Sequence, residues 1–166
     1  MIRKLQLLVV FFMTTVSVLA QKKQFTLEEI WGGAFRMEYL DRLESLNNGT
    51  EYSVLNTDRS TGSRSIDVYS YETGKKVRTL VDSKDLEGLD GFSTYAFSAD
   101  ESKILLGTNV RPIFRRSTLG DYYVYDTKSK KLTQVAENPI QEPTFSPDAT
   151  KVAYGQNNNL FYKNLI

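Results

Sequence analysis

A short segment that occurs twice in the chain limits the possible folds more than any other feature. Residues 97–108 (FSADESKILLGT) and 145–156 (FSPDATKVAYGQ) lie 48 residues apart, counted from Phe97 to Phe145, and share Phe, Ser, Asp, Lys and Gly at matching positions. A third, more divergent copy is residues 48–55 (NGTEYSVL). Each copy has the pattern of a strand, a tight turn and a second strand. Repeats of about 40–50 residues made of short strands are typical of propeller blades.

A second pair of matching segments supplies the rest of each blade. Residues 65–77 and 120–132 are both aromatic-rich stretches followed by a polar turn and a Lys-Lys-apolar stretch. One blade is therefore predicted to have strand A ending at Phe97, strand B at 103–108, strand C at 121–126 and strand D at 131–135. The last copy has A, B and C (159–164), and the sequence stops at Ile166 before a strand D. We expect an all-β chain that forms a partial β-propeller of about two and a half four-stranded blades, preceded by a signal peptide and a short helix.

The amino-terminal residues have the pattern of a targeting segment. Arg3 and Lys4 precede an apolar run over residues 5–19, which predicts a signal peptide over residues 1–20 with cleavage after Ala20. A transmembrane anchor is the alternative, but the run is short for the roughly 20 apolar residues that a span needs. The expected location is secreted or periplasmic. The expected domain is residues 21–166, an incomplete propeller without a catalytic hydrolase domain.

Composition excludes several classes of site. The chain has 21 basic and 20 acidic residues, so it has no polyelectrolyte character and nucleic acid is not an expected partner. It has no Cys and no His, which excludes disulfides, thiolate or His-ligated metal sites and a Ser-His-Asp triad. Four carboxylates at residues 82, 85, 87 and 90 could be read as a calcium site, but their spacing favours solvated charges in a long turn. We expect no cofactor and no metal.

Three local motifs predict the entry into the fold. Thr26 and Glu29 form a capping box for a short helix over residues 27–30. Trp31 precedes two glycines, and packing between blades is favoured for it over a role as a ligand platform. Asn48-Gly49 favours a hairpin turn over a glycosylation site.

The connection between strands B and C of the second blade carries an unusual set of residues. Residues 109–119 (NVRPIFRRSTL) hold Arg111, Arg115 and Arg116 beside a proline and Phe114, whereas the first blade has a Ser/Thr/Gly loop at 56–65. Such arginines are often simply solvated. However, apolar neighbours can fix a guanidinium, whose planar fork of donors suits carbonyl or carboxylate groups.

Several segments in register resemble a known family. The sequence is similar to the amino-terminal region of bacterial dipeptidyl peptidase IV, in the prolyl oligopeptidase group of serine peptidases. The resemblance covers the chain beyond residue 20 and rests on Leu27–Arg36, Thr50–Leu55, Phe114–Ser117 with Tyr122–Asp126, and Phe145–Asp148 with Asn158–Lys163.

The resemblance implies a fold, an activity and one site residue. Family members have an amino-terminal β-propeller, which gates and binds the substrate, and a carboxy-terminal α/β-hydrolase domain that bears the catalytic triad. They remove X-Pro or X-Ala dipeptides from peptides with a free N-terminus, and the whole enzyme is expected to be a homodimer. By motif position, the substrate-binding arginine of the family is Arg115. The glutamate pair and the triad of the family would lie beyond Ile166, so no catalytic residue is expected within these residues.

Two functions are therefore open at this stage. The first is the amino-terminal part of a secreted dipeptidyl peptidase IV-like serine exopeptidase, truncated and not catalytic by itself. The second is a stand-alone periplasmic propeller-like module that binds a partner protein. The ending favours the first, because two and a half blades would leave sheet edges exposed.

Overall fold

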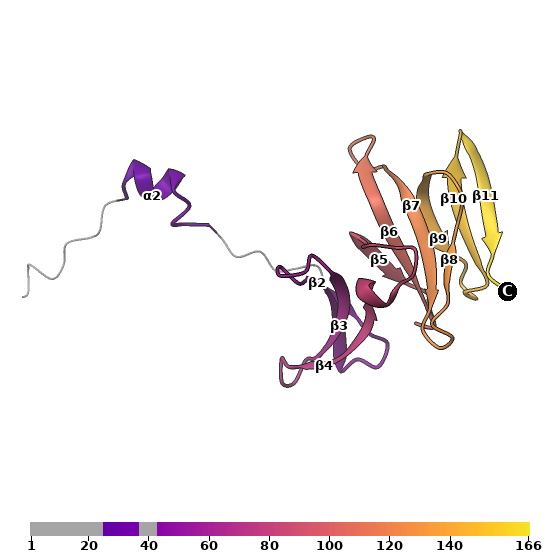
Figure 1. Ribbon diagram of the computed structural model, residues 1–166, viewed down its shortest axis with the longest axis horizontal. Coiled ribbons are helices and arrows are strands. Elements are labelled where there is room, and N and C mark those ends of the chain that lie inside the picture. The colour runs from indigo at the N-terminus through magenta and orange to yellow at the C-terminus, as the bar shows by residue number, and fades with distance from the viewer. Residues whose placement is uncertain (1–24, 37–42) are drawn as a thin grey trace, which may run out of the picture. The chain divides into compact units, whose positions relative to one another are not determined.

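The structure, a computed structural model, describes residues 25–36 and 43–166 (Figure 1). The chain divides into two units, Met1–Leu40 and Asp41–Ile166. In the first, helix α2 spans Leu27–Trp31, and the predicted capping box is present: Glu29 N donates to Thr26 Oγ1 at 3.1 Å, and Thr26 N donates to Glu29 Oε2 at 3.2 Å. The helix runs one residue further than expected, to Trp31, and Gly32 is its C-cap. The predicted signal peptide, residues 1–20, lies outside the described residues.

The second unit is built of antiparallel strands and one short 3₁₀ helix, η1 (Ser83–Asp85). The strands are β1 (Leu43–Ser45), β2 (Glu51–Thr57), β3 (Arg64–Ser70), β4 (Lys76–Asp82), β5 (Thr94–Phe97), β6 (Lys103–Pro112), β7 (Thr118–Asp126), β8 (Leu132–Gln134), β9 (Ile140–Phe145), β10 (Lys151–Gln156) and β11 (Asn159–Asn164).

The strands group into repeated blades, as the sequence repeat predicts. One sheet has the order β1-β2-β3-β4, and β5 to β8 follow the same up-and-down order in the second sheet. Strands β9, β10 and β11 repeat A, B and C, and β9 joins the preceding blade through only two residue pairs, Leu119–Gln141 and Gly120–Ile140. The prediction of an all-β partial propeller is confirmed. Figure 1 shows β11 at the edge of the last blade, beside β10.

The turn between strands A and B has the same hydrogen bonds in the two clear copies. Ser98 Oγ donates to Asp100 Oδ1 at 2.7 Å and accepts from Lys103 N at 3.0 Å. Ser146 Oγ donates to Asp148 Oδ1 at 2.6 Å and accepts from Lys151 N at 2.9 Å. The matching Ser, Asp and Lys positions of the repeat are therefore turn chemistry.

The divergent copy keeps the backbone of this turn and loses its hydroxyl. Leu46 N donates to Glu51 O at 3.0 Å, and Asn48 Oδ1 accepts from Thr50 N at 3.0 Å. Gly49 has a φ of 68°, a left-handed conformation that glycine adopts without steric cost. The turn predicted at Asn48-Gly49 is confirmed.

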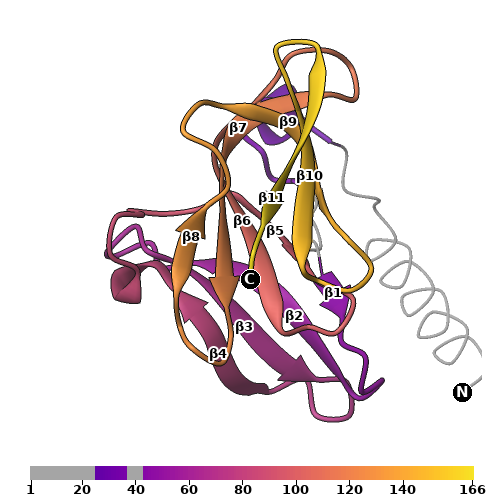
Figure 2. The same ribbon diagram turned by 90° about the vertical axis from the view of Figure 1, so that its right-hand side faces the viewer.

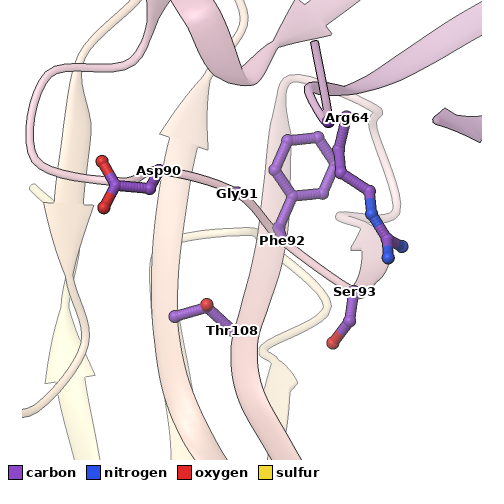
Figure 3. Close-up of a pocket in the computed structure, with 7 residues that line it drawn as sticks. Arg64, Asp90, Gly91, Phe92, Ser93 and Thr108 are labelled. Carbon is purple, nitrogen blue, oxygen red and sulfur yellow. The ribbon is translucent and has the colours of Figure 1, made fainter. Parts of the chain in front are cut away.

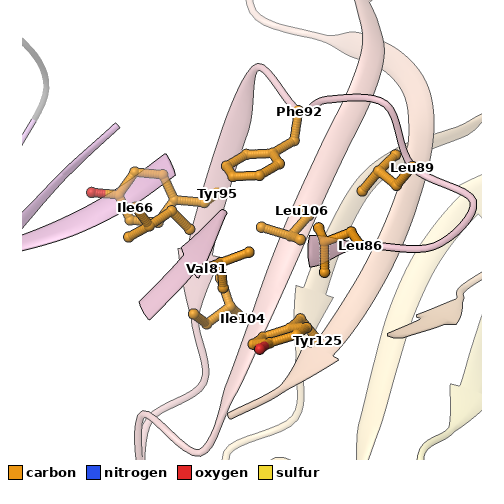
Figure 4. Packing of buried hydrophobic residues seen from close by; sticks show 9 residues of the cluster. All are labelled: Ile66, Val81, Leu86, Leu89, Phe92, Tyr95, Ile104, Leu106 and Tyr125. Carbon is orange, nitrogen blue, oxygen red and sulfur yellow. The ribbon is translucent and has the colours of Figure 1, made fainter. Parts of the chain in front are cut away.

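A buried apolar cluster joins the first two blades (Figure 4). Ile66 and Val81 of the first blade pack with Ile104 and Leu106 of the second, and all four side chains are almost fully buried. The connection between β4 and β5 adds Leu86, Leu89 and Phe92 to the cluster. The carboxylates of Asp85, Glu87 and Asp90 on this connection are exposed, as predicted. Asp82 caps η1 by accepting from Lys84 N at 3.0 Å.

Candidate functional site

The second-blade hairpin is longer and more regular than its sequence predicts. Strands B and C were expected at 103–108 and 121–126, but β6 continues to Pro112 and β7 begins at Thr118. The ladder resumes beyond an irregularity with the pairs Arg111–Leu119 and Pro112–Thr118. The loop is thereby reduced to Ile113–Ser117, and Ile113 N donates to Ser117 O at 2.9 Å to close it. In both views this hairpin and the β10–β11 hairpin lie at the same end of the sheet (Figures 1 and 2).

A bulge directs the outer part of this hairpin. Asn109 and Val110 stand opposite Gly120, and Asn109 has a φ of 52° while its Nδ2 donates to Asp121 Oδ2 at 2.9 Å. A Cβ added at Gly120 would lie 2.8 Å from Val110 Cγ2 and 3.1 Å from Thr108 O. Only glycine therefore allows the bulged strand to approach this closely.

Arg115 lies at the tip of the hairpin and is exposed, together with Phe114 and Arg116. The side chains of Arg115 and Arg116 have no ion pair or hydrogen bond within the described residues. Phe114 is itself 76% exposed. The tip thus presents two free cationic forks, and the assignment of Arg115 to substrate binding stays a prediction.

In the corresponding loop of the first blade, the charged side chain of Asp58 has hydrogen-bond and ion-pair partners within the same blade. Asp58 accepts from Ser60 Oγ at 2.6 Å and Ser60 N at 2.8 Å, and it lies 3.5 Å from Lys84 Nζ. The hydrogen bonds from Ser60 hold the pKa of the Asp58 carboxyl well below its usual range. The carboxylate of this loop is therefore engaged within the first blade, whereas the Arg115 and Arg116 side chains have no hydrogen bond or ion pair within the described residues.

A hollow of about 320 Å³ lies where the first two blades meet (Figure 3). Arg64, at the start of β3, extends its half-buried side chain toward Ser93, and Asp90 points to the opposite side. A second hollow, of about 650 Å³, lies one blade further on. Residues 48 positions apart line both: Asp90 and Asn138, Gly91 and Pro139, Ser93 and Gln141, Thr108 and Gln156. The blade repeat therefore forms a hollow at each of the two positions. The first is lined by the charged side chains of Arg64 and Asp90, and the second by amide side chains such as those of Asn138 and Gln141.

Sequence reasoning missed two residues of this region. The repeat predicted neither Arg64 nor Glu142, which accepts a hydrogen bond from Thr118 N next to the arginine loop. Pro143 could have indicated an irregular backbone at Glu142, because a proline inside a strand often marks a bulge.

The remaining candidates carry no site in the described part of the chain. Trp31 is 85% exposed within its own unit. Residues 25–36 and 43–166 contain no group of three or more acidic side chains that could hold a metal ion. The described helices include none that is long and apolar enough to cross a membrane.

Comparison with known proteins points to one family. Residues 98–166 match the model of the dipeptidyl peptidase IV (DPP IV) N-terminal region. The chain is 27% identical to prolyl endopeptidase FAP of Homo sapiens over 143 residues, which are 85% of this chain and 18% of that protein. It is 33% identical to dipeptidyl aminopeptidase B of Saccharomyces cerevisiae over 69 residues, which are 42% of this chain and 8% of that protein.

A solved structure supports the same relationship. The crystal structure of Porphyromonas gingivalis dipeptidyl peptidase 4 superposes with a TM-score of 0.72 at 30% identity, covering 86% of this chain and 20% of that one. The chain therefore spans about a fifth of the length of prolyl endopeptidase FAP and of the Porphyromonas gingivalis enzyme. The resemblance predicted from the sequence motifs is confirmed: the chain is similar, in sequence and in fold, to the amino-terminal propeller region of the dipeptidyl peptidase IV family.

Proposed function

We propose that this chain is the amino-terminal, substrate-binding region of a dipeptidyl peptidase IV-like serine exopeptidase. The whole enzyme would remove X-Pro or X-Ala dipeptides from peptides with a free N-terminus, with the triad supplied by a hydrolase domain. The observation that carries the proposal is the arginine hairpin. Its tip offers the unpaired guanidinium of Arg115 at the position that the family motif assigns to substrate binding.

The chemistry of the hairpin supports this role. A guanidinium presents several donors in one plane, so it can bind a backbone carbonyl of the substrate with a defined orientation. The short loop, Ile113–Ser117, limits the conformations from which Arg115 can act. In this account the propeller gates and orients the peptide, and the chemical step belongs to the hydrolase domain.

The experiment is a peptidase assay on the product of the whole open reading frame that contains this sequence. Release of Gly-Pro from a chromogenic dipeptide substrate is expected, and N-acetylation of that substrate should abolish release, since the enzyme requires a free N-terminus. A purified, folded product without activity would overturn the proposal and favour a partner-binding propeller module instead.

Secretion is part of the proposal. The leader over residues 1–20 would be cleaved after Ala20, which places the enzyme in the periplasm or outside the cell. Amino-terminal sequencing of the purified protein should begin at Gln21. A protein that keeps Met1 in the membrane fraction would contradict cleavage.

A further inference from the structure

Glu142 stands in a backbone conformation that its neighbour makes costly. Its φ is 46°, in the left-handed region, and it directly precedes Pro143. Left-handed backbone is unfavourable for a residue with a side chain, and helical backbone is further disfavoured before proline. Such strain persists only where the surrounding structure imposes it, and it is concentrated at functional sites.

The strain arises from a bulge in β9. Thr144 pairs with Ala153 and Gln141 pairs with Gly155, so Glu142 and Pro143 together face the single residue Tyr154 of β10. A bulge of this kind bends the strand and redirects a side chain. Here the redirected side chain is the Glu142 carboxylate.

The carboxylate replaces the next hydrogen bond of the ladder between blades. The pairing of β7 with β9 ends at Leu119–Gln141, and one step further Thr118 faces Glu142. Thr118 N donates to Glu142 Oε1 at 2.9 Å. This charge-assisted bond fixes the first residue of β7, which is also the residue that follows the arginine loop.

We propose that Glu142 is a positioning residue for Arg115, and this inference rests on the proposed function. Thr118 is three positions after Arg115, and the Ile113–Ser117 loop has few other attachments: Ile113 N and Phe114 N both donate to Ser117 O, at 2.9 and 3.4 Å. Glu142 therefore attaches the end of β7 that adjoins the loop to the third blade. Loss of its carboxylate leaves the pairs Leu119–Gln141 and Gly120–Ile140 as the connection between β7 and β9, so the loop has one attachment fewer and Arg115 samples a wider range of positions.

The first test is amide hydrogen exchange on the product of the whole reading frame. Glu142→Gly removes the acceptor and tolerates the left-handed backbone, whereas Glu142→Gln keeps a carbonyl acceptor in place. We expect exchange at the Thr118 amide to be about tenfold faster in Glu142→Gly and nearly unchanged in Glu142→Gln. Lys130→Gly is the matched control, because Lys130 has a φ of 61° in a turn remote from the hairpin. Equal protection of Thr118 in Glu142→Gly and the unmodified chain would overturn the proposal.

The second test separates this inference from the proposed function. In the whole-reading-frame product, Glu142→Gly should raise KM for a Gly-Pro substrate several-fold, with Glu142→Gln restoring it. If Arg115→Ala impairs turnover and Glu142→Gly leaves KM unchanged, Glu142 does not position Arg115. If the product has no peptidase activity, the proposed function fails, and the exchange result alone decides whether Glu142 holds the hairpin.

Discussion

The hydroxyl groups of Ser53 and Tyr95 lie 2.9 Å apart across the boundary between the first two blades. Ser53, on β2, is fully buried, and Tyr95, on β5, is almost so. Ser53 Oγ also lies 3.3 Å from Glu44 O, to which it donates. Tyr95 is also a member of the apolar cluster, so this buried hydrogen bond adds a polar contact to the packing between the two blades.

Removal of this hydroxyl should weaken the interface measurably. Ser53→Ala is expected to lower the free energy of unfolding by about 0.5–1.5 kcal/mol, the net contribution of a hydrogen bond, as measured by urea denaturation. Ser45→Ala is the matched control, because Ser45 Oγ and Tyr71 OH form a similar pair at 2.7 Å on the exposed surface. Equal losses of unfolding free energy in the two variants would show that burial does not increase the contribution of the Ser53–Tyr95 hydrogen bond to stability.

Stability should fall in acid because of the repeated turns. The pKa values of Asp100 and Asp148 are each lowered from 3.8 to about 2, chiefly by hydrogen bonds from the Ser98 and Ser146 hydroxyls. Since the folded pKa is below the unfolded one, each carboxylate stabilises the fold above pH 3.8 and loses this contribution as the pH falls toward 2.

The double variant Asp100→Asn, Asp148→Asn tests this pH dependence. The slope of stability against pH between about 4 and 2 should be smaller in the double variant, because two depressed titrations are gone. Urea denaturation at several pH values measures the slope. The slope should not vanish, since Asp67 and Asp126 also have lowered pKa values. An unchanged slope would mean that these turns do not contribute to acid sensitivity.

The isolated 166-residue chain should self-associate through β11. All six residues of this strand are exposed, its partner in the sheet is β10, and Leu160 is 81% exposed. An uncovered apolar strand edge is a template for pairing with another chain. Leu160→Lys should reduce association in sedimentation velocity, and Phe114→Lys, an equally exposed apolar site on a loop, should reduce it less. A chain that sediments as a monomer at every concentration would contradict this expectation.

The repeat could be predicted from sequence because its chemistry is local. Ser146, Asp148 and Lys151 bond to one another within a single turn, so their spacing identifies the turn directly. The bounds of β11 were predicted correctly for the same reason, since Asn157 and Asn158 both adopt the left-handed conformation of a tight hairpin.

The candidate site was less predictable because it depends on contacts between blades. Asn109 shifts the register of β6, and Glu142 bonds to Thr118 from 24 residues away. Neither effect has a periodic signature in the sequence. Arg64 likewise reaches its hollow only because the β4–β5 connection brings Ser93 beside it.

The most direct test of the central claim compares two adjacent arginines in the whole enzyme. Arg115→Ala removes charge-assisted hydrogen bonds worth roughly 1.5–3 kcal/mol each, so kcat/KM for a Gly-Pro substrate should fall by roughly ten- to a hundred-fold. Arg115→Lys should recover only part of the loss, because an ammonium group cannot reproduce the planar fork. Arg116→Ala should remain close to the unmodified enzyme. A large loss of kcat/KM in Arg116→Ala together with a nearly unchanged kcat/KM in Arg115→Ala would contradict the assignment of Arg115. A nearly unchanged kcat/KM in both variants would contradict a substrate-binding role for the hairpin.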